Sequence, residues 1–360
     1  MPYPNELAPL TVIQGAMRFN TDSMKLEYYR GGPVGFGTTT QTGEWVNITT
    51  DSPDIQTGGA RGLWAGGNNP ALFGGAYNGT NTIDYVTIST TGNAIDFGDR
   101  TVAIYNLTAL ASSTRGIFAS GFLNPGLTNV IDYVTISSTG NAIDFGDKIT
   151  ASEAGAACAS STRGVFAGGN TNNIEYITIA SLGNSVSFGT LTQGRSTFSG
   201  CSSSTRGVFA GGQTPTYQNT IDFITISSTG NASDFGDLTV IRGYNGSCSN
   251  SIRGVFGGGL SPTPASNTLV NVIDYITITT LGNSIDFGDF SAVRFDTGAC
   301  ASSTRGVFGG GNSPDLSTRV NTIDYITIMS VGNAVDFGDL TVVRNSITSG
   351  ACSNGHGGLG

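Results

Sequence analysis

Short apolar runs alternate with polar, glycine-rich turns along most of the chain. The clearest copy of this pattern lies between Arg305 and Asp339: the run RGVFGGG, a loop, the run NTIDYITI, a turn, and NAVDFGD. These runs are rich in β-branched and aromatic residues, are bounded by Gly or Asn, and are too short for an amphipathic helix, so they predict β-strands. The segment DTGACASST before Arg305 predicts one more strand. We therefore expect units of four antiparallel strands.

This unit occurs six times, at intervals of 43 to 54 residues. The copies begin at Arg61, Arg115, Arg163, Arg206, Arg253 and Arg305. Such a period is typical of arrays and propellers. The first copy lacks a clear strand segment before it, whereas the chain finishes with such a segment, SITSGACSN, and no copy follows. We predict an all-β, six-bladed β-propeller over residues 58–360, in which the C-terminal strand closes the first blade and leaves no open sheet edge.

The order RGVFAGG, NTIDYITI, NAIDFGD and an Arg-containing segment such as TVVRNSITSG resembles the kelch repeat over roughly residues 57–360. The chain departs from the kelch pattern in the last strand of each unit, where Phe replaces the usual Trp. These residues are Phe97, Phe145, Phe188, Phe235, Phe287 and Phe337. The resemblance implies a kelch-like propeller. Because that fold serves both binding proteins and enzymes, it does not select a function.

Residues 1–57 do not repeat and are expected to form a separate β module. The run GAMRFNTDSMKLEYYRGG predicts a hairpin around NTDS, GEWVNIT predicts a third strand, and residues 51–60 predict a linker. Alone, this module is too small to bury a stable core, so we expect it to pack on a partner. Over about residues 9–50 it is similar to a short module of bacteriophage tail-fibre and other virion proteins, which implies anchoring or assembly of subunits, often as trimers. A simple folded cap is the alternative.

The loops between the second and third strands differ among the copies, whereas the SSTRG and STGN turns recur. In an antiparallel four-stranded blade these two classes of connection lie on opposite faces. Variable loops on a rigid scaffold usually carry recognition, and unconstrained drift is the alternative. The candidate binding residues are Phe73, Tyr77, Gln213, Tyr217, Asp315 and Arg319 in these loops, with Tyr105 and Tyr244 in the fourth-to-first connections.

An acidic residue recurs in the third strand of every unit: Asp84, Asp132, Glu175, Asp222, Asp274 and Asp324. Further acids recur in the fourth strand, except in the third unit, where Ser187 and Thr190 replace both and suggest a shared local partner. Paired carboxylates can catalyse glycoside hydrolysis, but a catalytic pair breaks symmetry and these acids obey it. We therefore expect them to be structural, either capping turn amides or pairing with the repeat Arg.

Five cysteines occupy one position of the repeat: Cys158, Cys201, Cys248, Cys300 and Cys352, with Leu110 in the second unit. Neighbouring blades place equivalent Cα atoms beyond the roughly 7 Å that a disulfide spans, so we expect free, packed thiols. His356 is the only histidine, which excludes a zinc site with several histidines, and we expect it to be a solvated tail residue. We predict no catalytic residue, metal or cofactor.

The formal net charge of −9 argues against nucleic acid as a partner, because phosphate binding needs a basic surface. No window approaches 18 apolar residues and no signal peptide is visible, so we expect no membrane insertion. Our first hypothesis is a non-enzymatic phage virion protein: a tail fibre, head fibre or decoration protein on the particle surface, made in the host cytoplasm. Residues 1–57 would bind other virion proteins, the loops a host-surface glycan or protein, and the chain would form a homo-oligomer, with a trimer favoured. A propeller glycosidase or depolymerase acting on cell-surface polysaccharide, and a non-virion interaction scaffold, are the alternatives.

Overall fold

The computed structural model describes residues 17–20, 25–31, 43–47, 60–69, 79–262, 267–313, 318–345 and 347–359. The chain divides into two compact units, Met1–Ser52 and Pro53–Gly360. In the first unit, β1 (Met17–Asn20), β2 (Lys25–Gly31) and β3 (Gly43–Asn47) form an antiparallel sheet in the order β1-β2-β3. The hairpin and third strand predicted there are present. Most of the predicted linker, residues 51–59, lies outside the described residues.

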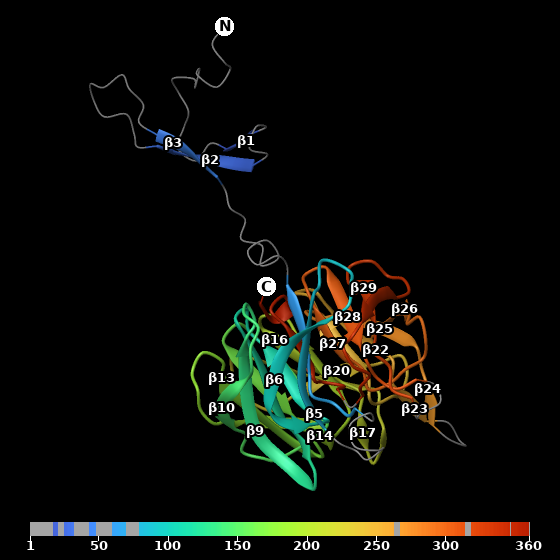
Figure 1. Ribbon diagram of the computed structural model, residues 1–360. Helices are drawn as coiled ribbons and strands as arrows, with labels where there is room; N and C mark the ends of the chain where they lie inside the picture. The colour runs from blue at the N-terminus through green and yellow to red at the C-terminus, as the bar shows by residue number, and fades with distance from the viewer. Residues whose placement is uncertain are drawn as a thin grey trace, which may run out of the picture. The chain divides into compact units, whose positions relative to one another are not determined.

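In the second unit, six four-stranded antiparallel sheets form a ring, which confirms the predicted propeller (Figure 1). We name the strands of each blade a to d from the centre outwards. The a strands are β31 (Ala351–Ser353), β7 (Thr108–Ala111), β11 (Ala156–Ala159), β15 (Ser199–Ser202), β21 (Gly246–Ser249) and β27 (Gly298–Ala301). The b strands are β4 (Arg61–Ala65), β8 (Arg115–Leu123), β12 (Arg163–Ala167), β16 (Arg206–Ala210), β22 (Arg253–Gly257) and β28 (Arg305–Gly309).

The outer half of each blade holds the remaining two strands. The c strands are β5 (Thr80–Thr87), β9 (Gly126–Thr135), β13 (Thr171–Thr178), β19 (Thr220–Thr225), β25 (Val272–Thr277) and β29 (Thr322–Thr327). The d strands are β6 (Ile95–Ile104), β10 (Ile143–Asp147), β14 (Val186–Arg195), β20 (Ser233–Asp237), β26 (Ile285–Asp289) and β30 (Val335–Asp339). Two b–c loops carry small hairpins, β17 (Gln213–Thr214) with β18 (Thr216–Tyr217) and β23 (Leu260–Pro262) with β24 (Asn267–Leu269). A 3-10 turn, η1 (Gly357–Leu359), follows β31.

The C-terminal strand closes the ring as predicted. Strand β31 pairs antiparallel with β4, Cys352 opposite Leu63, and so completes the first blade in the order β31-β4-β5-β6. Asn354 Oδ1 accepts a hydrogen bond from the backbone N–H of Arg61 at 2.7 Å. The pairing covers the b-strand edge that a three-stranded first blade would expose.

The propeller has two different faces. The a–b and c–d turns lie together, since the residue that follows each c strand donates its N–H to the a–b turn, as Ile328 does to Thr304 O at 2.9 Å. We call this the constant face, and the chain enters β4 here through Ala60. The b–c loops and the d–a connectors between blades lie on the opposite side, the variable face, where the hairpins β17–β18 and β23–β24 are also found (Figure 1).

Contacts between neighbouring blades repeat around the ring. The Asn of each c–d turn accepts a hydrogen bond from a d-strand N–H of the preceding blade, as Asn141 Oδ1 does from Asp99 N at 3.0 Å. The turn also adds backbone bonds to that strand: Gly140 N donates to Phe97 O and Ala142 N to Asp99 O. These bonds cover part of the outer edge of every blade, which would otherwise be open to pairing.

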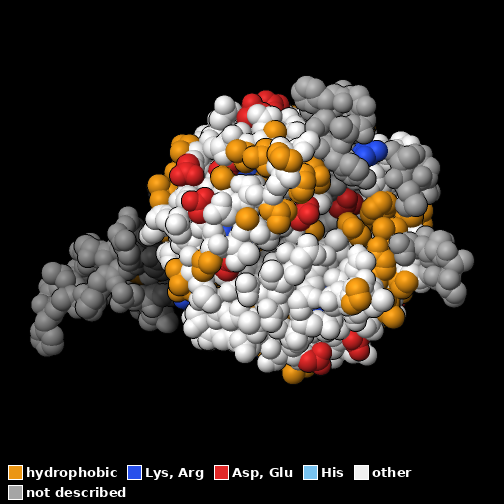
Figure 2. Space-filling model, turned by 90° about the horizontal axis from the view of Figure 1, so that it is seen from below, with side chains coloured by type: hydrophobic (Ala, Val, Ile, Leu, Met, Phe, Trp, Pro, Cys, Tyr) orange, Lys and Arg blue, Asp and Glu red, His pale blue; other side chains and the backbone are white. Residues whose placement is uncertain are grey.

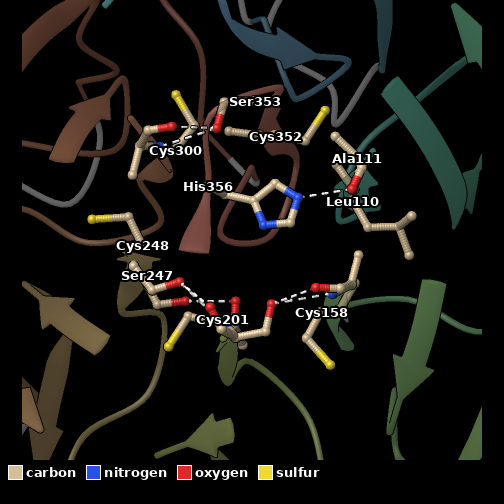
Figure 3. Close-up of a pocket in the computed structure, with 18 of the residues that line it drawn as sticks. Leu110, Ala111, Cys158, Cys201, Ser247, Cys248, Cys300, Cys352, Ser353 and His356 are labelled. Carbon is tan, nitrogen blue, oxygen red and sulfur yellow. Dashed lines mark hydrogen bonds between the residues drawn. The ribbon is translucent and has the colours of Figure 1, made fainter. Parts of the chain in front are cut away.

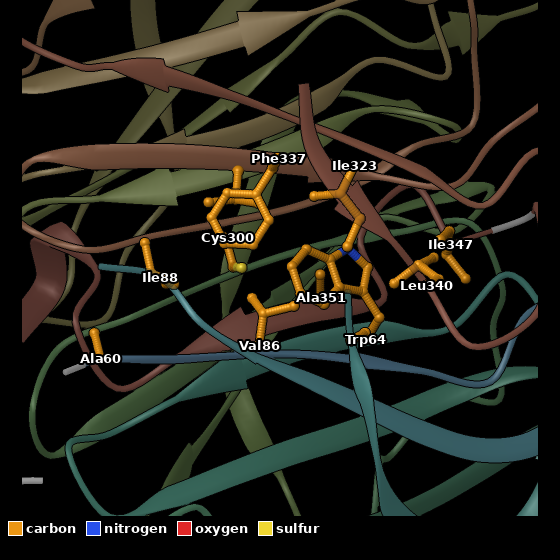
Figure 4. Close-up of a cluster of buried hydrophobic side chains, with 12 residues drawn as sticks. Ala60, Trp64, Val86, Ile88, Cys300, Ile323, Phe337, Leu340, Ile347 and Ala351 are labelled. Carbon is orange, nitrogen blue, oxygen red and sulfur yellow. The ribbon is translucent and has the colours of Figure 1, made fainter. Parts of the chain in front are cut away.

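The core lies between the blades. At the joint of the sixth and first blades, Trp64 is fully buried among Val86, Ile323 and Phe337, and its indole N–H donates to Gly298 O at 3.0 Å (Figure 4). A hydrogen bond for the indole is what burial of a Trp requires. In the described part of the chain, no helix has the length and apolar composition needed to cross a membrane.

Candidate functional site

The repeated c-strand acids are buried in ion pairs that join the blades. Each Asp faces an Arg from the preceding blade or connector. The pairs are Arg344 with Asp84, Arg100 with Asp132, Arg195 with Asp222, Arg242 with Asp274 and Arg294 with Asp324. Four of the carboxylates also accept a backbone N–H, as Asp222 does from Thr192. The predicted capping of backbone amides is present at these four acids, whereas the predicted pairing with the repeat Arg is wrong.

The joint between the second and third blades differs. Lys148 stands in place of the Arg, and its ammonium donates to Ser152 Oγ at 2.7 Å. Burial lowers the pKa of Lys148 to about 8, although the charge of Glu175 opposes the shift. Glu175 itself accepts hydrogen bonds from the backbone of Ile149 and from Ser185 Oγ. The longer acid therefore still caps the connector, but through different partners.

The repeat Arg residues have a separate structural role. The guanidinium of each lies over an aromatic ring of its own c strand, as Arg253 does over Tyr275 with 4.3 Å to the ring centroid. Its Nη1 donates to a carbonyl in the c–d turn of the next blade, as Arg115 does to Ile179 O at 2.8 Å. The set comprises Arg61, Arg115, Arg163, Arg206, Arg253 and Arg305.

The five cysteines are free and buried, as predicted. Each sulfur points away from the centre of the ring of a strands (Figure 3). It fills the space beside the Gly that follows the repeat Arg in the next blade, as Cys248 does beside Gly306. Burial raises the pKa of Cys201 and of Cys352 to about 12, so these thiols are protonated at neutral pH. Among the described residues, no group of three or more His, Cys, Asp or Glu side chains is arranged to hold a metal ion.

The a strands surround a cavity of about 50 Å³ lined by Ala, Cys and Ser side chains, which we call the channel (Figure 3). Serine hydroxyls donate to a carbonyl of the neighbouring a strand, as Ser202 does to Ala159 O at 2.7 Å and Ser249 to Ser202 O at 2.8 Å. These carbonyls belong to strand edges that face the channel and have no further strand to pair with. The serines therefore stabilise the inner edge of the ring.

His356 does not lie in a solvated tail, so that prediction was wrong. Its imidazole points into the ring of a strands, where Nε2 donates to Ala111 O at 2.7 Å and Nδ1 accepts from Gly358 N at 3.1 Å (Figure 3). The two bonds select the neutral tautomer with hydrogen on Nε2. Burial lowers the pKa of His356, and the bond to the Ala111 carbonyl partly opposes this shift. The buried Gly357 and Gly358 lie against carbonyls of neighbouring a strands.

The last connector lies across the other end of the channel. It is two residues longer than the one before it, since Gly350 follows Arg344 by six positions and Gly298 follows Arg294 by four. Ser349 O accepts from Ala109 N at 2.6 Å, and Ser349 Oγ donates to Phe198 O at 3.3 Å, in the fourth blade. With His356 at the constant face, each end of the channel is occupied by the protein's own residues. A ligand site is therefore to be sought on the variable face rather than in the channel.

Around this end of the channel, the connectors present a pair of residues that differs from blade to blade. We call the set the mouth ring: Tyr105 and Asn106, Glu153 and Ala154, Ser196 and Thr197, Gly243 and Tyr244, Phe295 and Asp296, and Asn345. The second residue of the first five pairs has a positive φ of 52° to 67°. Such strained conformations persist only where neighbours fix them, and they concentrate at functional sites.

The backbone beneath the mouth ring is regular although the side chains differ. Consecutive connectors are linked by backbone hydrogen bonds, such as Thr197 N to Ala154 O at 2.7 Å and Tyr244 N to Thr197 O at 2.6 Å. Most connectors also pair with the b–c loop of the blade that they enter, as Gly243 does with Leu260. Figure 2 shows this face, on which groups of hydrophobic side chains are separated by uncharged surface with dispersed acids. The arrangement is a rigid scaffold that carries different side chains.

Five of the predicted binding residues lie in this region. Tyr105 packs on Phe122 with ring centroids 5.3 Å apart, and Tyr244 packs edge-on to Phe295 at 5.7 Å. Gln213 and Tyr217 face each other across the β17–β18 hairpin. Arg319 Nε donates to Asn345 Oδ1 at 3.3 Å. The other three, Phe73, Tyr77 and Asp315, lie outside the described residues.

Phe295, Thr197 and the other connector residues apart from Tyr105 and Tyr244 were not predicted from the sequence. Their signal was present: the connectors differ at this pair of positions, while the strands on either side keep their pattern. No model of a known protein family matches the sequence, and the search of curated proteins found no match either.

Proposed function

We propose that the chain is a structural protein of a bacteriophage particle, a tail fibre, head fibre or decoration protein, that displays its propeller for adhesion to a host surface. The observation that carries the proposal is the division of the propeller into two faces. The constant face carries closely similar turns from blade to blade and receives the chain at Ala60, whereas the variable face holds different side chains on a regular backbone. A scaffold of this kind separates attachment from recognition.

The N-terminal sheet supports the attachment half of the proposal. It has only three short strands, and a sheet of so few residues buries little core of its own. Its sequence resembles modules that join subunits in phage fibres. We propose that residues 1–57 bind other virion proteins or further copies of this chain, with a trimer as the favoured assembly.

The arrangement of carboxylates supports binding rather than catalysis. The symmetric c-strand acids are held in buried ion pairs. The mouth ring contains two acids outside the sixfold pattern, but they belong to connectors three steps apart in the ring, hence on opposite sides. Glu153 accepts from Asn106 Nδ2 at 2.9 Å, and Asp296 accepts from Thr348 Oγ1 at 2.5 Å. Glycoside hydrolysis needs two carboxyl groups about 5 to 10 Å apart on either side of one bond.

Competition for adsorption tests the proposal. Particles produced by the genome that encodes this chain should contain it by mass spectrometry, and an excess of soluble full-length chain should lower their adsorption rate to host cells several-fold. Absence from the particle, or no competition at saturating protein, would reject the proposal. Release of reducing ends from host polysaccharide by the purified chain would favour the depolymerase alternative.

Bulky chemical labels at two positions of one blade show which face of the propeller competes for adsorption. Thr216 in β18 and Thr229 in the following c–d turn are both exposed, on the variable and the constant face respectively. The native thiols are buried, so a single cysteine introduced as Thr216→Cys or Thr229→Cys can be coupled selectively to a polyethylene glycol maleimide. The label at 216 should abolish competition and the label at 229 should leave it unchanged.

A further inference from the structure

We propose that Tyr217, Tyr244 and Phe295 form a platform for an uncharged saccharide. We call these three residues the aromatic row. This inference depends on the proposed display function and assigns a ligand class to one sector of the variable face, between the fourth and sixth blades. The row joins a b–c hairpin to two successive connectors, and all three residues are half-buried, so that each ring has both a fixed and an exposed part.

Two of the three rings are in direct contact, and the third lies against the connector that carries one of them. Tyr244 and Phe295 pack edge to face with centroids 5.7 Å apart. Tyr217 lies against the backbone of Gly243, the neighbour of Tyr244: a Cβ built on Gly243 would come within 2.9 Å of the Tyr217 ring. The absence of a side chain at position 243 therefore lets Tyr217 approach the connector. A sugar ring stacks its C–H face on such aromatic surface, whose large area is fixed by only two side-chain torsions.

The backbone that carries the row is already fixed. Gly243 exchanges backbone hydrogen bonds with Leu260 at 2.9 and 3.0 Å, and Tyr244 N donates to Thr197 O at 2.6 Å. Tyr217 is held opposite Gln213 in the β17–β18 hairpin. Rings held in this way lose little conformational entropy when a ligand binds, which increases affinity for a weakly bound partner such as a sugar.

A polar group without a partner lies at the same place. Thr197 is 6% exposed, and its hydroxyl has no hydrogen-bond partner. The Thr197 hydroxyl oxygen and the Tyr217 ring approach the same side of Gly243, each 2.9 Å from a Cβ built there. A buried hydroxyl without a partner is costly, and saccharide hydroxyls, directly or through a water, supply both donors and acceptors. Gln213, the cross-strand partner of Tyr217, is half-buried, and its amide Nε2 donates to Pro215 O at 3.0 Å.

Charge selects an uncharged ligand. The chain has a net charge of −9, and the charged side chains of the mouth ring are the two acids Glu153 and Asp296, the latter adjacent to Phe295. Polyanions such as nucleic acids or sialylated and phosphorylated glycans are repelled by this field, which falls off over about 10 Å at moderate salt. A neutral polysaccharide avoids the repulsion and retains the stacking contacts.

Affinity electrophoresis of the full-length chain tests the assignment. Native gels containing dextran, pullulan, galactomannan or xyloglucan serve as neutral probes, and gels containing alginate serve as the anionic comparison. At least one neutral polymer should retard the protein and alginate should not. Retardation by alginate alone, or by none of the polymers, would overturn the assignment.

Variants locate the site. Tyr217→Ala and Tyr244→Asn, the latter because Asn tolerates positive φ, should each weaken the retardation at least tenfold. Thr197→Val keeps the shape of the side chain but removes the hydroxyl, and should weaken it about threefold or more. Phe122→Ala removes a half-buried aromatic ring from β8, in the second blade on the opposite side of the ring, and is the matched control with unchanged retardation.

The folding of each variant is checked by its thermal midpoint. A folded Tyr217→Ala protein that is retarded like the wild type would overturn the assignment. If neutral polymers fail while the soluble chain still competes with particles for adsorption, the display function stands and the aromatic row is not its site. A host-surface protein would then be the ligand to seek.

Discussion

At the scale of single residues, the ring depends on one small contact made repeatedly. The residue after the repeat Arg is Gly in every copy, and the sulfur of the preceding blade's Cys, or the Leu110 side chain, occupies the space beside it. At Gly306 an added Cβ would lie 2.5 Å from Cys248 Sγ and 3.1 Å from Ile326 Cγ1. Glycine is needed here because of the close approach of two blades, not because of its backbone conformation.

We expect Gly306→Ala to lower the free energy of unfolding by about 1–3 kcal/mol, the usual cost of overpacking a core. Adding Cys248→Ala removes the sulfur and should restore part of this loss. Denaturant unfolding of the two variants measures both effects. Gly126→Ala is the matched control, because no atom lies within 4 Å of its Cβ position. Equal stability of Gly306→Ala and Gly126→Ala, or no rescue by the second change, would contradict this explanation.

The sequence predicts some residue roles and hides others. The position of the cysteines in the repeat correctly predicted free, packed thiols. The bases that lie near the c-strand acids were missed because they occupy two sequence positions. Arg100 and Lys148 directly follow the d-strand Asp, whereas Arg242 and its equivalents come five residues after that position. Only the folded ring shows that both positions reach equivalent places beside a carboxylate.

At the scale of elements, the segment after β31 is the least expected part of the fold. The closing strand was predictable, since an orphan segment at one terminus matched a vacancy in the first blade. The docking of the tail was not, because a glycine-rich sequence with one His has the composition of a solvated end. It docks because Gly357 and Gly358 present no side chain to the neighbouring carbonyls and because His356 offers both a donor and an acceptor.

This docking should make stability depend on pH. The cavity around His356 is lined by uncharged side chains, and burial lowers its pKa below the ordinary value near 6.5. The unfolded chain therefore takes up the proton at a higher pH than the folded chain. The contribution of neutral His356 is fully present above about pH 6.5 and is lost as the pH falls from there through the folded pKa.

We expect the free energy of unfolding of the wild type to fall more steeply between pH 7 and pH 5 than that of His356→Gln. Glutamine retains a donor and an acceptor but does not titrate in this range. Denaturant titrations of both proteins across this interval give the comparison. Parallel pH profiles would show that the imidazole is not held in its neutral form.

At the scale of the whole molecule, the two-faced ring was predictable and the state of its channel was not. The six copies predicted the blades. Because successive strands of a blade are antiparallel, each class of connection could be assigned to one face. The obstruction of the channel depends on a connector only two residues longer than its neighbour and on Ser349 reaching Phe198 in the fourth blade. A length difference of that size has no distinctive pattern in the sequence.

Removal of residues 351–360 tests how far the ring acts as one unit. The truncated chain loses β31 and the docked tail, which leaves the edge of β4 unpaired and the channel open at the constant face. We expect the thermal midpoint to fall by roughly 10 °C, corresponding to about 4 kcal/mol at about 2–4 °C per kcal/mol. The remaining thiols should react with an aromatic disulfide reagent under conditions in which the full-length protein does not. An unchanged midpoint with protected thiols would show that the blades are stable independently.

The bond between Asn354 and Arg61 has a consequence for how the gene can be arranged. In the sixth blade the N–H of the repeat Arg donates to Ser302 in the turn just before it, and in the fifth to Asn250. Asn354 offers the same acceptor to Arg61 across the break in the chain. Circular permutation of the propeller should therefore be tolerated. A short link from residue 354 to residue 61, with new termini in another a–b turn, would keep every blade but would lose the tail that plugs the channel and the native connection to residues 1–60.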